Sequence, residues 1–556
     1  MLICFCMKFL KVLINSLISG LFFSTLLALL TYNLNTDMPF KISSFLLFTL
    51  FLCAVYGTVT ALACFVFFFI IQFFSGSKIN IYFVSPPFLY ISSLILVFVF
   101  LILSRANYKL FSSLLSPEIS KLTQNQVISL LFAFIIGIVS FLFILIYKKK
   151  YIFLAVYFCL LLLSTGYSFY LRTCYPQPET AKKIAELDAK SLDKKITIIG
   201  MEGLTFDFII PLISEQKLPN FSWLMEEGSW GKLENFTPTE LIILNRSFNT
   251  GKFPYKHGQV SREKCILLPL NMEILVIPRF ILFKQMERIK LIKCLFHEAP
   301  KKTKDIWEIL KNNNTPYLKK DKDYLNSDIN KLSSNTKSLL NRFFEDIDFE
   351  SDEIRQIAKN AFASDAEFLK SVEQEAEKVK PEIVYILLRG INLVEKYFYK
   401  YSFPELFEEV SQEEINKYGP VMERYYQFYD EVIGKYLAAK KDNELLVVYS
   451  PHGIDYLPVW KRMVELVLGN PKISAYHENA PKGVVFFYGK GISPGKNIED
   501  MKIIDMTPTF LHYLGLPLGK DMDGIVNSSI FKSSFNIENP VLYISSYEEV
   551  DIKPPQ

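Results

Sequence analysis

One histidine stands in the turn expected after an apolar run that is typical of a buried strand. The run Leu445 to Tyr449 has the unbroken hydrophobicity of a strand covered on both faces, and His452 follows it. Catalytic side chains of open α/β sheets gather at the carboxyl ends of such strands, and imidazole is a common metal ligand. His452 is therefore a candidate ligand. Its neighbour is Pro451, whose side chain offers a metal no donor atom.

The elements that would position His452 form an α/β pattern. Apolar strands are expected at Ile196 to Ile199, Val384 to Leu387 and Leu445 to Tyr449, separated by amphipathic helices. We expect a doubly wound, mainly parallel sheet from Lys194 to about Asn527, preceded by an all-α membrane domain. A closing helix is expected to end at Gly515.

The chain before this pattern is much more apolar. Five runs of about 20 residues or more could cross a bilayer, from roughly Phe9 to Tyr32, Ser44 to Phe74, Tyr82 to Ser104, Val127 to Tyr147 and Tyr151 to Leu171. The first run exceeds a signal-peptide core and has no clear small-residue cleavage site, which favours a retained helix. We expect a membrane domain at 1–172, a juxtamembrane linker at 173–193 and an exported α/β domain at 194–556.

Basic residues in the short loops predict the orientation. The turn Lys148 to Lys150 belongs in the cytoplasm, and Lys8 and Lys11 agree with that placement. A weaker opposing signal comes from the third loop, with Arg105, Lys109 and Lys121. An odd number of spans then places the C-terminal domain outside the cytoplasm, on a multi-pass protein of the inner or plasma membrane.

Charge and cysteine content exclude two broad classes. The net charge of +4 is small and mixed along the chain, so no nucleic-acid surface is indicated. Of eight cysteines, five lie in or beside the apolar runs, and the remaining Cys174, Cys265 and Cys294 make no disulfide framework. A Cys265–Cys294 bridge is an open alternative, but free thiols are favoured.

The stretch 265–296 fits the α/β domain least well. It is rich in large aliphatic residues, is interrupted by Pro269 and Pro278, and carries several lysines and arginines. Two interpretations remain open: a surface excursion packed on the α/β domain, or an amphipathic segment on the outer membrane leaflet with its lysines toward lipid phosphates.

Four segments in chain order resemble the alkaline phosphatase superfamily, most closely its type I phosphodiesterase/nucleotide pyrophosphatase branch. They are "IGMEGLTFDFIIPLISEQKLPNFSWLMEEGSWGKL", "SFNTGKFPYKHG", "SPHGID" and "GISPGKNIEDMKIIDMTPTFLHYLGLPLGKDMDG". This resemblance implies phosphoester chemistry in which a Thr or Ser oxygen attacks phosphorus between two divalent metals. Five helices before such a domain also resemble the layout of lipoteichoic acid synthases and phosphoethanolamine transferases.

The resemblance implies seven site positions, most of which hold an unsuitable residue. They are filled, in chain order, by Glu202, Leu241, Asn392, Lys396, Pro451, His452 and His477. Leu241 stands at the nucleophile position without an oxygen. Asn392, Lys396 and Pro451 replace an Asp, a His and an Asp. A two-metal mechanism cannot operate on this set, although Glu202, His452 and His477 could hold one ion.

Alternative roles for these and nearby residues are less specific. Thr239 could replace the nucleophile only if the turn is rebuilt, because a shift of two residues at a helix start rotates a side chain by about 200°. Glu202 is expected to pair with Lys396, and Arg246 could add a second cation to the same cleft. His452 and His477 could simply form hydrogen bonds in a polar pocket.

Three functions of different classes remain. The favoured one is a catalytically degenerate domain that binds a phosphate-bearing ligand or a membrane protein partner and needs no cofactor. The second is an active phosphoester hydrolase or head-group phosphotransferase that uses one divalent ion, Zn or Mn. The third is a structural membrane subunit. Membrane lipids are expected contacts in all three, and nucleic acid in none.

Overall fold

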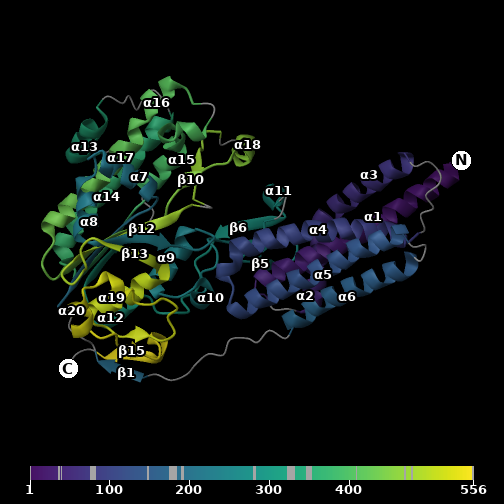
Figure 1. The fold of residues 1–556 in the computed structure, drawn as a ribbon, viewed down its shortest axis with the longest axis horizontal. Coiled ribbons are helices and arrows are strands. Elements are labelled where there is room, and N and C mark those ends of the chain that lie inside the picture. Colours follow the sequence, from purple (N-terminus) through teal and green to yellow (C-terminus); the bar gives the residue numbers. More distant parts are fainter. Residues whose placement is uncertain are drawn as a thin grey trace. The chain divides into compact units, whose positions relative to one another are not determined.

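The computed structural model describes residues 2–35, 38, 41–74, 83–146, 150–173, 185–188, 193–279, 283–321, 332–345, 353–407, 410–468, 471–477 and 480–553. By their internal contacts the residues form two compact units. The helical unit comprises Met1–Thr180 with Gln259–Ala299, and the α/β unit comprises Ala181–Gly258 with Pro300–Gln556. Figure 1 shows the elements of both units.

The helical unit is built from long apolar helices. They are α1 (Leu2–Leu34), α2 (Ile42–Leu52) continuing through a π-helical turn (Cys53–Gly57) into α3 (Thr58–Phe74), α4 (Pro86–Phe111) with a short 3₁₀ turn (Ser112–Leu114), α5 (Pro117–Ile146) and α6 (Lys150–Thr173). Among the described residues, five spans are long and apolar enough to cross a membrane: Phe9–Leu34, Ile42–Ile71, Pro86–Leu114, Pro117–Ile144 and Tyr151–Tyr170. The expected five apolar helices are therefore confirmed. Lys148 and Lys149, which carry the orientation signal, lie outside the described residues.

The excursion after Gly258 belongs to the helical unit. It forms a three-stranded antiparallel sheet, in the order β5-β4-β6, with one helix: β4 (Glu263–Leu267), β5 (Met272–Ile274), α11 (Phe283–Arg288) and β6 (Ile292–Phe296). Cys265 and Cys294 lie opposite each other on neighbouring strands and form a disulfide. The favoured expectation of free thiols is therefore wrong, because strand pairing brings together two cysteines 29 positions apart. The division of the chain also differs from the expected one, since 259–299 groups with the helices.

The α/β unit is organised by a seven-stranded sheet in the order β13-β3-β12-β9-β2-β8-β7. Its strands are β2 (Lys195–Met201), β3 (Ser229–Glu234), β7 (Tyr317–Lys320), β8 (Ile383–Leu388), β9 (Glu444–His452), β12 (Lys482–Gly489) and β13 (Lys496–Lys502). Only β12 runs antiparallel to both neighbours. Short pairs outside this sheet are β1 (Ala185–Asp188) with β16 (Val550–Lys553), β10 (Asp455–Tyr456) with β11 (Ala475–Tyr476), and β14 (Leu518–Gly519) with β15 (Tyr543–Ile544).

Both faces of the sheet are buried under helices, which explains the unbroken apolar strands. Leu446 and Val448 of β9 face one apolar cluster, and Leu445, Val447 and Tyr449 face the other. The first face packs against α7 (Phe206–Ser214), α8 (Pro219–Glu227), α13 (Ser334–Phe344), α14 (Glu353–Val379), α15 (Gly390–Ser402) and α17 (Pro420–Ala439). The second packs against α9 (Leu241–Thr250), α12 (Ile306–Asn312) and α19 (Met506–Leu514). The remaining helices are α10 (Pro254–His257), α16 (Gln412–Tyr418), α18 (Val459–Leu468) and α20 (Ser533–Glu538), with 3₁₀ turns at Pro404–Leu406, Ile503–Asp505, Ser528–Ile530 and Tyr547–Glu549.

The expected α/β class and mainly parallel sheet are confirmed. β2, β8 and β9, which cover the three expected strands, are all interior to the sheet. The closing helix α19 ends as expected, because Gly515 has a left-handed conformation with φ of 71°. The carboxyl ends of β2, β8 and β9 lie at the same edge, since these strands are parallel and adjacent.

Candidate functional site

Glu202 occupies a tight turn directly after β2. Its N–H donates to the carbonyl of Leu388 at 2.9 Å, which extends the pairing with β8 by one residue. The next residue, Gly203, has φ of 109°, and its N–H donates to Ser450 Oγ of β9 at 3.0 Å. A Cβ at Gly203 would lie 2.3 Å from Glu395 Oε2, so the turn requires glycine. Both neighbouring strands thus fix the position of the Glu202 carboxylate.

The Glu202 carboxylate is buried and surrounded by nitrogen atoms. Asn392 Nδ2 donates to Oε1 at 2.7 Å, Arg389 Nε lies 3.7 Å from Oε2, and His452 Nε2 lies 3.4 Å from Oε1. Burial alone would raise the pKa of Glu202, but His452, Arg389 and Lys396 outweigh burial and hold that pKa below its usual value. Glu202 is therefore an ionised carboxylate that already has partners on both oxygens.

His452 and His477 lie together at the end of β9. His452 is fully buried, and its Nδ1 is 2.9 Å from the carbonyl oxygen of Gly453, so Nε2 is the nitrogen that faces Glu202. The ring of His477 stacks on His452 with centroids 5.1 Å apart and planes inclined by 26°. Thr239 Oγ1 donates to the carbonyl of His477 at 2.6 Å. Two stacked rings do not point their nitrogen lone pairs at one common atom.

The remaining positions implied by the resemblance have structural partners. Leu241 is the first residue of α9 and packs against the second apolar cluster. The carbonyl of Pro451 accepts a hydrogen bond from Asn235 Nδ2 at 3.1 Å. The charge of Lys396 on α15 lowers the pKa of Glu202, although Arg389 is the cation found within 4 Å of its carboxylate. Arg246, expected as a possible second cation of the same cleft, lies 3.6 Å from Asp305.

Two residues of the cluster were missed by the sequence reading. Arg389 follows the apolar strand β8 directly, and a charged residue in that place was a usable signal. Glu395 lies on α15 three positions after Asn392, so the two share a helix face. Glu395 is fully buried and accepts a hydrogen bond from Tyr426 Oη at 3.1 Å. Burial raises the pKa of Glu395 well above its usual value, and the nearby charge of Glu202 adds to that rise.

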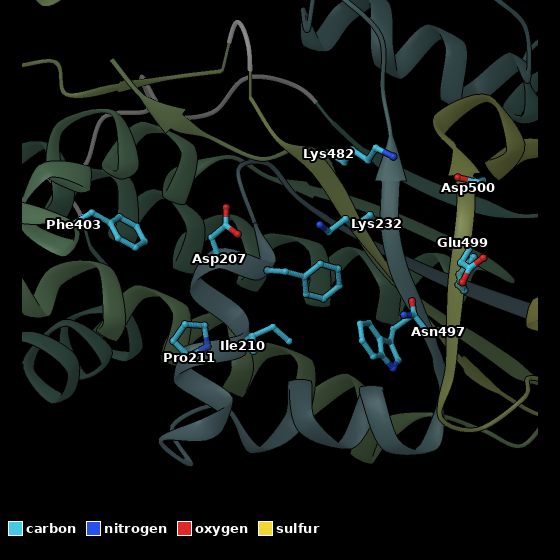
Figure 2. A pocket seen from close by; sticks show the side chains of 12 residues that line it. Asp207, Ile210, Pro211, Lys232, Phe403, Lys482, Asn497, Glu499 and Asp500 are labelled. Carbon is cyan, nitrogen blue, oxygen red and sulfur yellow. The ribbon is translucent and has the colours of Figure 1, made fainter. Parts of the chain in front are cut away.

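A groove adjoins this cluster on the α7 face of the sheet. It has a volume of about 890 Å³, and Figure 2 shows the side chains that line it. Phe206, at the start of α7, meets Trp230 edge to face with centroids 5.4 Å apart. Lys482, which lines the groove, pairs in register with His452 of the buried cluster, and its ammonium pairs with Glu234. Lysines and carboxylates both line the groove: Lys232, Lys482, Asp207, Glu499 and Asp500.

These residues do not fit a two-metal centre. Among the residues that the structure describes, no three His, Cys, Asp or Glu side chains are grouped to hold a metal ion. Pro451 and Leu241 provide no side-chain donor, and the nitrogens of Asn392 and Arg389 already satisfy Glu202. The side chains at the carboxyl edge of the sheet therefore do not provide enough suitable ligand atoms for two divalent ions.

Comparisons with known proteins agree with the family resemblance over a limited part of the chain. Residues 196–264 match the model of the type I phosphodiesterase/nucleotide pyrophosphatase family. Murine ectonucleotide pyrophosphatase/phosphodiesterase 5 is a structural match in two forms. An inactive variant in complex with AMP has 12% identity, covering 58% of this chain and 96% of that chain, with a TM-score of 0.34. The other has 13% identity, covering 58% and 95%, with the same TM-score. No curated protein matches the chain.

Proposed function

We propose that this protein is a membrane-anchored, catalytically degenerate relative of the type I phosphodiesterases, whose α/β unit binds a phosphate-bearing ligand without hydrolysing it. The observation that carries this proposal is the closed environment of Glu202. An amide, a guanidinium and an imidazole surround the carboxylate, and the residue at the expected nucleophile position is Leu241. The nitrogen atoms around Glu202 and the absence of a hydroxyl on Leu241 support this proposal.

The charges at the cluster favour an anionic ligand. The pKa of Glu202 is held below its usual value, whereas burial raises the pKa of Glu395 well above its usual value. Arg389 and Lys396 both bring positive charge to the surroundings of Glu202. The neighbouring groove is within the size range of sites for small organic molecules, and Phe206 and Trp230 offer ring surfaces for the body of a ligand. A phosphate group at Lys396, with its organic part in the groove, fits both features.

We further propose that the α/β unit lies outside the cytoplasm. The basic turn Lys148 to Lys150 favours this orientation, and the Cys265–Cys294 disulfide supports it. Disulfides persist mainly in oxidising compartments. The disulfide-bonded excursion joins the α/β unit directly at Gly258 and Pro300, so both would lie on one side of the membrane.

A single-cation enzyme is the second candidate, and one observation favours it. Asn392 Oδ1 and His452 Nε2 are buried beside Glu202 and have no hydrogen-bond partner within the described part of the chain. Together with a Glu202 oxygen they could hold one divalent ion such as Zn or Mn. Such an ion could polarise a phosphoryl oxygen or activate water.

Binding and hydrolysis assays on the full-length protein in detergent separate the two candidates. We expect inorganic phosphate and a nucleoside monophosphate to bind, and p-nitrophenyl phosphodiesters to remain intact with Zn or Mn present. Lys396→Gln should weaken phosphate binding about tenfold, whereas Lys490→Gln, an exposed lysine on the turn after β12, should leave it unchanged. Hydrolysis that is abolished by Glu202→Gln would establish the enzyme instead. Absence of phosphate binding would refute the ligand proposal.

A further inference from the structure

The disulfide-bonded excursion 259–299, here called the β4–β6 element, is held by two buried asparagines of the membrane helices. Asn35, directly after α1, accepts the N–H groups of Leu275 at 3.0 Å and Val276 at 2.7 Å, and its Nδ2 donates to the carbonyl of Val276 at 2.7 Å. Asn107 Oδ1 on α4 accepts the N–H of Arg279 at 2.7 Å. Asn35 and Asn107 are 4% and 1% exposed, so these bonds are shielded from solvent.

These contacts place the β4–β6 element at the carboxyl ends of α1 and α4. Asn35 follows the last residue of the first candidate span, Phe9–Leu34. Asn107 lies seven residues before the end of the span Pro86–Leu114, which is about 10 Å along the helix axis. The segment 275–279 therefore lies beside the terminal turns of two spans. In a bilayer, those turns pass through the interfacial layer.

The β4–β6 element exposes apolar side chains next to basic ones. Ile289 is 66% exposed and Leu268 is 48% exposed, and the N–H of Leu268 donates to the carbonyl of Leu291 at 3.0 Å, which brings both turns to one end of the sheet. Arg288, Lys290 and Lys293 are exposed around Ile289. The segment 259–299 contains seven basic and four acidic residues, a net charge of +3.

We propose that this end of the β4–β6 element binds the lipid surface of the outer leaflet. Ile289 and Leu268 enter the boundary between headgroups and acyl chains, and Arg288, Lys290 and Lys293 meet phospholipid phosphates. Two features select the bilayer as the partner: the element is fixed to the ends of membrane helices, and its basic groups complement anionic lipid. An exposed aliphatic turn fixed at that level enters an apolar layer with a gain of roughly 25 cal/mol per Å² buried.

Tryptophan quenching in nanodiscs tests this proposal, because all native tryptophans lie in the α/β unit: Trp223, Trp230, Trp307 and Trp460. The full chain carrying Ile289→Trp would be placed in nanodiscs with or without bromine on the acyl chains. The added emission should fall by roughly half in brominated lipid. The matched control is Glu263→Trp, at the opposite end of β4, whose emission should hardly change.

The charge contribution has its own comparison. Lys290→Glu with Lys293→Glu, in the Ile289→Trp background, should reduce quenching in discs that contain phosphatidylglycerol more than in pure phosphatidylcholine. Leu268→Trp provides a second reporter if Ile289→Trp does not fold, as judged by formation of the disulfide on a non-reducing gel. Equal quenching of Ile289→Trp and Glu263→Trp, or none at either Ile289 or Leu268, would overturn the proposal and indicate that the patch faces water or a protein.

Discussion

Asn392 donates its side-chain N–H to Glu202 Oε1 at 2.7 Å across the edge between β2 and α15. The carboxylate at the expected metal position is thus occupied by an amide from the same chain. Arg389 approaches the other oxygen, so Glu202 forms part of a buried ionic cluster. The proposed ligand-binding function rests on that cluster.

The Glu202–Arg389 contact should stabilise the folded protein more than a solvent-exposed ion pair at 3.7 Å would, because both groups are shielded from water. Removing either charge takes this contact away from the other, shielded side chain, which should cost about 3 kcal/mol of unfolding free energy. We expect Glu202→Gln and Arg389→Gln each to lower the free energy of unfolding. The double variant should lose less free energy than the sum of the two single losses. The free energy of unfolding of the wild type, the two single variants and the double variant can be measured by denaturant unfolding followed by tryptophan fluorescence. Strict additivity would contradict the coupling.

Gly390, the first residue of α15, should tolerate no side chain. A Cβ there would lie 1.9 Å from Tyr425 Oη and 2.3 Å from Asp365 Oδ2. Asp365 also accepts the N–H of Gly390 at 3.2 Å and the hydroxyl of Tyr429 at 2.6 Å, so the start of α15 cannot shift freely. Gly390→Ala should cost about 3 kcal/mol or prevent folding. Gly166→Ala, where a Cβ meets nothing within 4 Å, is the matched control.

His257 should make the α/β unit sensitive to acid. Burial, followed by the charges of Arg246 and Lys252, lowers the pKa of His257 to about 3, and Ser247 Oγ lies 2.8 Å from its Nε2. Because the unfolded chain binds this proton at its ordinary pKa near 6.5, stability falls as the pH drops from 6.5 toward 3. The loss approaches about 1.4 kcal/mol per pH unit. Thermal unfolding between pH 7 and 4 should show a shallower slope for His257→Gln, and an unchanged slope would contradict this assignment.

The Cys265–Cys294 disulfide gives a direct test of orientation. In intact cells that produce a Cys174→Ser variant, a membrane-impermeant maleimide should label Cys265 and Cys294 only after mild reduction. Protease added outside should then also cleave the α/β unit. Labelling without reduction would show free thiols. Protection of both cysteines and of the α/β unit in intact cells would place them in the cytoplasm.

Much of the fold could be predicted because local patterns determine it. Leu445 to Tyr449 is apolar without a break because both faces of β9 are covered, and the five apolar helices follow from length and composition alone. The disulfide and the grouping of 259–299 with the helices could not be predicted. The disulfide follows from the pairing of β4 with β6, and the grouping depends on the side-chain amides of Asn35 and Asn107, which meet backbone more than 170 positions away.

The candidate site could likewise be predicted only in part. Glu202 and His452 could be located, because Glu202 directly follows a recognisable strand and His452 lies at the end of another. Their partner Arg389 was overlooked, and Lys396 was expected in its place. Arg389 lies in the connection between β8 and α15, whereas Lys396 lies within α15, and the path of the chain after β8 brings the guanidinium of Arg389 within 4 Å of Glu202.

Metal content tests the central claim most directly. The full-length protein should be purified without added metal or chelator, and its zinc and manganese measured by mass spectrometry alongside a His452→Ala variant. If the cluster around Glu202 is a metal-free binding site, both proteins should carry well under one ion per chain and the substitution should change nothing. One zinc or manganese ion per chain that is lost in His452→Ala would contradict the account.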